Sequence, residues 1–327
     1  MRDIRKEVMD KMKKIASSAI FLSGLALILA VLSAVITPYG EVYNIIDVEK
    51  KTSYFSKEAK NTIDVIILGD SETYSAFNPL QIYKEQGITS YVCGTHAQRL
   101  CDTLSILETT LETQSPEIVV LETNCLFRYA GVKPQMTDRT LYEVSQYLPV
   151  LKYHNRWKQV FSTINPSEQK KLEREHMRKG FKLRTDVTPY TSGAWMHESE
   201  NRKAFGEKVE EYLTKIYELC DQNDIELLLV TTPAPDNWTY EKHNTVSDWA
   251  DKKGVMYLDM NLKTEELQID WEKDTRDGGD HLNFAGATKV TAFFGSYLKG
   301  NYALSDHRQD EVYSSWNEDL ENCGMKF

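Results

Sequence analysis

The sequence predicts an α/β domain, a parallel β-sheet covered by helices on both faces, preceded by one membrane-spanning helix. Short apolar runs of three to six residues recur along the chain, and longer amphipathic stretches separate them. Such alternation is typical of strands and helices that build a parallel sheet. One uncharged run of 23 residues near the N-terminus is much longer and predicts the membrane helix.

The composition places the chain among ordinary globular proteins. Its 327 residues are 41% hydrophobic and 27% charged, which excludes collagen, long disorder and multi-span membrane proteins. The net charge of -10 argues against a nucleic-acid binder. The five cysteines form no CxxC pair and no cluster with histidine at metal-ligand spacing, so we expect no metal and no cofactor. Most of them are expected to be buried free thiols.

The uncharged run spans residues 15–37 and is long enough to cross a bilayer core as a helix. Six basic residues lie within residues 1–14, whereas acidic residues come first after Pro38. The positive-inside rule therefore predicts a cytoplasmic N-terminus and an extracytoplasmic domain. The run exceeds an ordinary signal-peptide core and lacks a clear cleavage site, so we expect an uncleaved signal anchor in the cell membrane rather than a cleaved signal peptide.

The rest of the chain divides into a stalk at residues 38–61, a domain at residues 62–300 and a peripheral tail at residues 301–327. A polar stretch at about 128–200 interrupts the alternation and is expected to be an insertion. The expected strands are residues 63–68, 90–92, 117–121, 226–231 and 255–258. The expected helices are residues 101–112, 203–223, 244–253 and 285–298.

Two segments carry residues suited to nucleophilic catalysis. Ser71 follows the first expected strand, at the sheet edge where parallel sheets bind ligands. Residues 277–283 place Asp277 and Asp280 near His281 in a glycine-rich loop. A serine becomes a useful nucleophile when an imidazole takes its proton and a carboxylate orients that imidazole. We assign Asp277 as the acid, with Asp280 as the alternative, because neighbouring residues in extended chain point to opposite sides.

Together these segments resemble the SGNH, or GDSL-type, hydrolase family, which has a three-layer α/β/α fold. The sequence Gly69-Asp70-Ser71 matches the family's first block, Gly94 its second-block glycine and Asn124 its third-block asparagine. The resemblance implies that His281 is the general base and that Ser71, Gly94 and Asn124 form an oxyanion hole. The chain departs from the family where Gly278 stands at the usual aspartate position. It also has Glu122-Thr123-Asn124 in place of the usual Gly-x-Asn-Asp.

The anchor and these blocks together look most like the membrane-anchored proteins of alginate acetylation and teichoic acid D-alanylation, which work beside membrane-bound O-acyltransferases. This resemblance implies a serine-dependent acyltransferase that O-acetylates a surface or secreted polysaccharide, with a multi-span membrane-bound O-acyltransferase as partner. Two alternatives stay open. One is an esterase with water as acceptor, and the other is an inactive scaffold for the acyltransferase.

Four further residues are assigned to substrate binding. Asp70 and His96 adjoin the nucleophile and the second-block glycine, and Trp238 ends a loop that leaves the sheet at the same edge. Lys179 belongs to a basic stretch, residues 152–184, with ten basic and three acidic residues. This stretch could hold an anionic or sugar polymer, or lie against lipid headgroups near the anchor. The alternatives are turn hydrogen bonding for Asp70, a surface loop for His96 and a solvated helix face for the basic stretch.

Overall fold

The structure is a computed structural model that describes residues 2–36, 55–127, 150 and 166–326. It divides into two compact units, one made of Met1–Ile46 and Thr137–Thr163 and the other of Asp47–Met136 and Ile164–Phe327. Most of the expected stalk and the first part of the expected insertion lie outside the described residues. In the first unit, α1 (Arg2–Ile36) includes a span, Lys11–Val35, that is long and apolar enough to cross a membrane. Its side chains are exposed, as expected of a signal anchor or a signal peptide.

The second unit contains a five-stranded parallel sheet, which confirms the predicted α/β fold class. Its strand order is β2-β1-β3-β4-β5. The strands are β1 (Val65–Leu68), β2 (Ser90–Val92), β3 (Ile118–Glu122), β4 (Glu226–Thr231) and β5 (Met256–Asp259). Every strand begins and ends within two residues of its expected position, because the apolar runs that predict strands are also the segments buried on both faces of the sheet.

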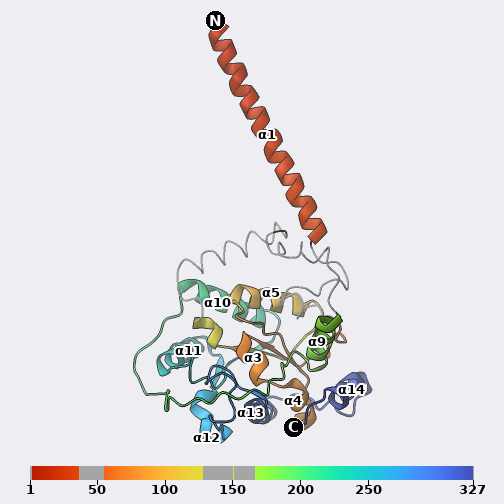
Figure 1. Ribbon diagram of the computed structural model, residues 1–327, viewed down its shortest axis with the longest axis vertical. Coiled ribbons are helices and arrows are strands. Elements are labelled where there is room, and N and C mark those ends of the chain that lie inside the picture. The colour runs from red at the N-terminus through yellow and green to blue at the C-terminus, as the bar shows by residue number, and fades with distance from the viewer. Residues whose placement is uncertain (1, 37–54, 128–149, 151–165, 327) are drawn as a thin grey trace. The chain divides into compact units, whose positions relative to one another are not determined.

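Helices cover both faces of this sheet. Figure 1 shows α5 beside α10 on one side of the domain and α4 beside α13 on the other. Val65 and Ile67 of β1 join the core cluster of α4 and α13, as the two-residue alternation of a strand requires. The helices that the sequence predicts are α5 (Leu100–Leu111), α10 (Glu207–Asp221), α11 (Tyr240–Lys253) and α13 (Phe284–Asn301). The helices that it does not predict are α3 (Ser71–Ala76), α4 (Pro79–Gln86), α9 (Pro166–Met177), α12 (Thr264–Leu267) and α14 (Ser314–Asn322).

The C-terminal tail packs against the domain, although it was expected to be peripheral. Trp316 of α14 is buried, and its ring centroid lies 5.2 Å from that of Tyr83 in α4. His307 Nε2 lies 3.1 Å from Asp64 Oδ1, beside the start of β1. The tail therefore packs on the domain near β1 and α4. In the sequence, the large apolar side chain of Trp316 indicates that the tail has a buried contact.

All five cysteines are buried. Burial raises the pKa of the Cys220 thiol to about 12, so this side chain stays protonated and unreactive at neutral pH. The cysteines act as small hydrophobic residues of the core, as expected for most of them.

The strand order reverses at β1, which lies between β2 and β3. After β1 the chain adds β2 on one side, and after β2 it crosses to place β3 on the other side of β1. Doubly wound sheets bind ligands where the strand order reverses in this way. Ser71 follows β1 and Asn124 follows β3, so the fold brings both to this point.

Candidate active site

A tight turn after β1 holds the nucleophile. Gly69 has φ +147°, and a Cβ added there would lie 2.7 Å from Thr73 Cγ2 and 2.8 Å from Glu122 Cβ. The buried Asp70 then caps α3, because its Oδ1 accepts the backbone N–H of Glu72 at 3.1 Å. Ser71 is the first residue of α3, and its backbone N–H therefore has no acceptor within the helix.

Ser71, His281 and Asp277 form a continuous hydrogen-bonded chain. Ser71 Oγ lies 2.8 Å from His281 Nε2, and His281 Nδ1 lies 2.7 Å from Asp277 Oδ2. The other oxygen of Asp277 accepts the backbone N–H of His281 at 2.7 Å. A carboxylate only accepts hydrogen bonds, so Nδ1 carries the ring proton and Nε2 is free to accept the proton of Ser71.

The loop that carries His281 explains why its acid stands four residues earlier. Thr275 and Leu282 close the loop through an isolated antiparallel bridge. Between them, Gly278 and Gly279 have φ +82° and +101°, a backbone region that favours glycine. These two left-handed residues turn the chain so that Asp277 faces both the backbone and the ring of His281.

Asp280 also faces His281, which differs from the expectation for neighbouring residues in extended chain. Its Oδ2 lies 3.2 Å from His281 Nδ1, and its Oδ1 accepts the side-chain amide of Asn237. The turn at Gly278 and Gly279 precedes Asp280 directly, so the extended-chain argument does not hold there. Asp277 makes the shorter contact with Nδ1 and a second bond to the backbone, and its geometry suits the orienting acid better.

Gly94 lies tightly against the nucleophile turn. A Cβ added at Gly94 would lie 1.8 Å from Thr73 Oγ1 and 2.6 Å from the carbonyl oxygen of Asp70. No side chain fits in this space, so glycine allows the loop after β2 to approach the backbone of Ser71 closely. Within the described part of the chain, no protein acceptor takes the backbone N–H of Gly94.

Lys242 of α11 fixes the orientation of the Asn124 side chain. Lys242 Nζ donates to Asn124 Oδ1 at 3.4 Å and also to the carbonyl oxygen of Asn237. An ammonium group can only donate, so the amide oxygen of Asn124 faces Lys242 and its NH₂ group faces elsewhere. The sequence analysis missed Lys242 because 118 positions separate it from Asn124 and no local pattern connects them.

Glu72 is a second residue that the sequence analysis missed. Its side chain is 1% exposed, and its Oε1 lies 3.9 Å from His281 Nε2. That oxygen has no hydrogen-bond partner among the described residues. Burial, followed by the nearby carboxylates of Asp70 and Glu122, raises the pKa of Glu72 well above its usual value. The raised pKa reduces the negative charge that Glu72 places beside His281 Nε2. The sequence offers only an acidic residue directly after Ser71, because tertiary contacts produce the burial of α3.

Ligand atoms of Glu72, Asp280 and His281 lie within 4.8 Å of one another, close enough to share a cation. A cation there would compete with Ser71 or Asp277 for the nitrogens of His281. A cation bound by these three residues would therefore replace one of the two hydrogen bonds that His281 makes in the triad.

The structure gives the four residues assigned to substrate binding different positions. His96 is exposed on the loop after Gly94, whereas Asp70 is a buried helix cap. Trp238 is buried and donates its indole N–H to Asp259 Oδ2 at 2.9 Å. Lys179 is 2% exposed, and its ammonium lies 2.7 Å from both Glu58 and Asp319. The structure therefore does not bring Lys179 to the triad, because the buried carboxylate of Glu58 and the partly exposed carboxylate of Asp319 hold its ammonium elsewhere.

A second histidine–aspartate pair lies at the end of β5. His243 Nδ1 is 2.8 Å from Asp259 Oδ2, which also accepts from Trp238 and from the hydroxyl of Tyr257. The other oxygen of Asp259 accepts the backbone and side-chain N–H groups of Asn261, both at 2.9 Å. Asp259 thus anchors the loops after β4 and β5.

Comparisons with known proteins show likeness in fold at low sequence identity. No family model and no curated protein matches the chain. A GDSL-like lipase from Bacteroides thetaiotaomicron is 12% identical, with a TM-score of 0.39 over 78% of this chain and 98% of that chain. A lipolytic protein of the G-D-S-L family from Desulfitobacterium hafniense is 13% identical, with a TM-score of 0.39. The match covers 73% of this chain and 100% of that chain. A structure described as an acylhydrolase, from Bacteroides fragilis, is 14% identical, with a TM-score of 0.38. The match covers 76% of this chain and 94% of that chain.

Proposed function

We propose that the protein is a serine-dependent acyltransferase that moves an acyl group, acetyl in this proposal, onto a polysaccharide through an acyl-Ser71 intermediate. The observation that carries this proposal is the hydrogen-bonded chain from Ser71 Oγ through His281 to Asp277, at 2.8 and 2.7 Å. A serine, an imidazole and a carboxylate in this order activate the serine hydroxyl as a nucleophile.

In the first half-reaction Ser71 Oγ attacks the carbonyl carbon of the acyl donor, and the hydroxyl proton moves to His281 Nε2. Asp277 stabilises the imidazolium that forms. The negative charge on the carbonyl oxygen is met by N–H donors from Ser71, Gly94 and Asn124, a set that contributes several kcal/mol. The tetrahedral intermediate collapses to acyl-Ser71, and the leaving alkoxide takes the proton back from His281.

In the second half-reaction a sugar hydroxyl attacks the acyl carbon and gives its proton to His281 Nε2. The ester forms on the sugar, and Ser71 Oγ leaves and regains the proton from His281. No cofactor takes part in either half-reaction. The steps balance because each proton that His281 accepts is returned to the departing oxygen.

Hydrolysis is the second candidate, and the exposure of the base supports it. The side chains of His281 and Asp277 are 11% and 36% exposed, so water can approach the edge of the site. With water as acceptor the same residues give an esterase. The triad geometry supports either enzyme over an inactive scaffold, since a scaffold does not need an imidazole aligned between a serine and a carboxylate.

The N-terminal helix supports a proposal for the location and for the partner. If α1 is an uncleaved anchor, the domain lies outside the cytoplasm while acyl-CoA lies inside. An extracytoplasmic transferase then requires a protein that passes acyl groups across the membrane, and a multi-span membrane-bound O-acyltransferase fits this requirement. The charge pattern before and after the apolar run of α1 supports this orientation.

The enzyme proposal is tested with the full-length chain in detergent and a chromogenic acetyl ester. We expect turnover by the wild type and loss of turnover in Ser71→Ala and His281→Ala, with unchanged melting temperatures. The matched control is Ser115→Ala, an exposed serine just before β3, at the opposite end of the strands from the triad. Turnover that survives in Ser71→Ala contradicts the proposed nucleophile.

Transfer is separated from hydrolysis by the products. The same preparation is given an acetyl donor and a soluble oligosaccharide, and the sugars are analysed by mass spectrometry. Acetylated sugar that depends on Ser71 supports the transferase. Free acetate alone, both here and in membranes that contain the acyltransferase partner, supports the esterase.

A further inference from the structure

A cavity of about 530 Å³ lies beside the His281 loop and outside the triad. Three aromatic side chains, Tyr190, Trp195 and Trp271, line it together with residues of α12 and the segment that follows. The ring centroids of Trp195 and Trp271 are 5.2 Å apart, and the ring planes meet at 85°. Tyr190 lies edge-on to both rings, at 6.1 Å from Trp195 and 6.0 Å from Trp271. All three residues are only partly buried, so the rings form an open aromatic corner.

The corner is held in place without a ligand. The Trp195 indole N–H donates to Asn261 Oδ1 at 3.3 Å, and the backbone N–H of Tyr190 donates to the carbonyl oxygen of Trp271 at 2.9 Å. Trp271 and Ile269 pack against the hydrophobic core. Binding surfaces that are fixed in advance lose less entropy when a ligand arrives.

Tyr190 connects this cavity to the catalytic loop. A Cβ added at Gly279 would lie only 2.7 Å from Tyr190 Cδ2, so the phenol ring packs directly on Gly279. Gly279 precedes His281 by two residues, and the backbone N–H of Gly278 donates to the carbonyl oxygen of Thr188 at 3.0 Å. A ligand in the cavity therefore lies next to the loop that carries the general base.

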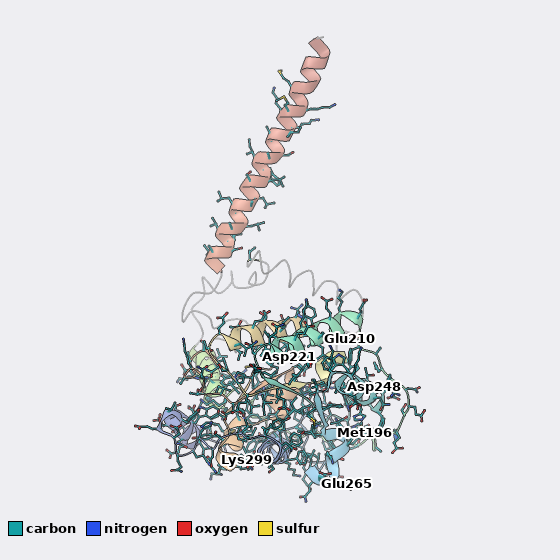
Figure 2. The ribbon with its side chains drawn as sticks, turned by 180° about the vertical axis from the view of Figure 1, so that it is seen from behind. Met196, Glu210, Asp221, Asp248, Glu265 and Lys299 are labelled. Atoms are coloured by element: carbon teal, nitrogen blue, oxygen red, sulfur yellow. The ribbon has the colours of Figure 1, made fainter. Side chains whose placement is uncertain are left out.

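The lining selects the chemistry of the ligand. A pyranose ring has apolar C–H faces that pack on aromatic rings and hydroxyl groups around its edge that need hydrogen bonds. Thr191, Thr264, Glu265 and Gln268 supply polar groups around the corner. The lining residues, all in the described part of the chain, include one acid and no lysine or arginine. Figure 2 shows Glu265 and Met196, the neighbour of Trp195, on the same side of the domain.

We propose that this aromatic corner binds a neutral pyranose unit of the acceptor glycan. The cavity volume falls within the range of about 300–1,000 Å³ usual for small-ligand sites. A uronate is disfavoured because its carboxylate meets Glu265 without a compensating cation. The assignment rests on the proposed function, since the sugar is taken to be the acceptor, and it adds that the polymer is uncharged at this subsite.

The proposal is tested by binding rather than turnover, with full-length Ser71→Ala protein in a detergent without a sugar headgroup. Isothermal titration uses cellopentaose, mannopentaose and xylopentaose as neutral probes and pentagalacturonate as the acidic probe. The test variants in this background are Trp195→Ala and Trp195→Phe. The control is Tyr217→Ala, which removes a partly buried aromatic ring of α10 away from the cavity.

We expect at least one neutral pentasaccharide to bind and pentagalacturonate to bind at least tenfold more weakly. Trp195→Ala weakens binding by about tenfold or more, because loss of an aromatic contact surface costs on the order of 1.4 kcal/mol. Trp195→Phe restores most of the affinity, and Tyr217→Ala binds like its parent. Melting curves of each variant show whether it is folded before titration.

Three results overturn the proposal: no binding of any neutral probe, equal binding by folded Trp195→Ala, or equal binding of pentagalacturonate. These failures are distinguishable from failure of the proposed function. Ser71→Ala makes no acyl-enzyme, so binding that Trp195 controls can stand even if no acyl transfer is found. Conversely, Ser71-dependent acyl transfer can stand even if no probe binds here.

Discussion

Two histidine–aspartate pairs lie at the carboxyl edge of one sheet, and their surroundings differ. His281 Nδ1 faces Asp277 at 2.7 Å, and its Nε2 faces Ser71 at 2.8 Å. His243 Nδ1 faces Asp259 at 2.8 Å, but the described residues place no serine, threonine or cysteine hydrogen-bonded to its Nε2. The aspartate of the second pair is also much less exposed, at 2% against 36% for Asp277.

The comparison shows that a histidine–aspartate pair alone does not define a catalytic base. Asp259 accepts hydrogen bonds from four residues, so its charge is used to hold two loops together. Asp277 serves mainly His281, through both the ring and the backbone. The hydrogen bonds of Asp259 stabilise the fold. Those of Asp277 leave Nε2 of His281 free to exchange a proton with Ser71.

The largest expected effect is a difference in turnover between variants of the two histidines. His281→Gln lowers turnover of a chromogenic acetyl ester by about a thousandfold or more, because Ser71 loses its base. His243→Gln keeps turnover within about tenfold but lowers the unfolding midpoint in urea, because Asp259 loses one buried partner. If folded His281→Gln and folded His243→Gln lose turnover equally, the two histidines do not have the different roles described here.

The second prediction is a difference in kcat between variants of Asp277 and Asp280. Asp277→Asn lowers kcat by about a hundredfold or more, since the amide no longer holds the imidazole in the required tautomer. Asp280→Asn lowers it less than about tenfold, because the Asp277 contact remains. Steady-state kinetics of both variants checks this order, and the reverse order would make Asp280 the orienting acid.

The third prediction concerns Lys242 and the asparagine that it orients. Lys242→Met lowers kcat by about tenfold with little change in KM, because Asn124 then loses the donor that fixes its amide. Lys242→Arg recovers part of this loss, since a guanidinium can also donate to Asn124 Oδ1. Lys252→Met, on the last turn of the same helix, is the control. A rise in KM alone would show that Lys242 contacts the substrate instead.

The smallest effect is on stability and depends on pH. The folded-state pKa of Glu72 is raised, mainly by burial, so the folded protein binds this proton more tightly than the unfolded chain does. The unfolded chain loses this proton above about pH 4.3, and the wild type therefore loses stability relative to Glu72→Gln as pH rises above that value. We expect Glu72→Gln to melt a few degrees higher at pH 8 and at nearly the same temperature at pH 4. A lower melting temperature at pH 8 would show that folded Glu72 is ionised.

Much of the fold could be predicted from sequence because its strands are apolar on both faces. All five strands and four long helices coincide with apolar runs and amphipathic stretches. The short helix α3 was missed because polar residues such as Ser71, Glu72 and Thr73 make it up, and contacts with the rest of the domain bury them. Tertiary packing, not helix propensity, determines this segment.

The site was predicted only as far as local patterns reach. The segments around Ser71, Gly94, Asn124 and His281 have recognisable short sequences, and the structure brings the triad residues together. Lys179 was placed by a basic stretch of sequence, but the structure buries it between two acids from distant segments. Long-range pairs of this kind follow from the packing of the whole domain, which charge counts along the chain do not include.

Covalent labelling tests most directly whether the His281–Asp277 pair activates Ser71. The full-length protein is treated with a fluorophosphonate, which modifies activated serines, and peptide mass spectrometry locates the adduct. The account predicts one rapidly formed adduct on Ser71, formed normally in His243→Gln and at least about a hundredfold more slowly in His281→Ala. An unlabelled Ser71 in folded protein, or equal labelling rates in His281→Ala and wild type, would contradict it.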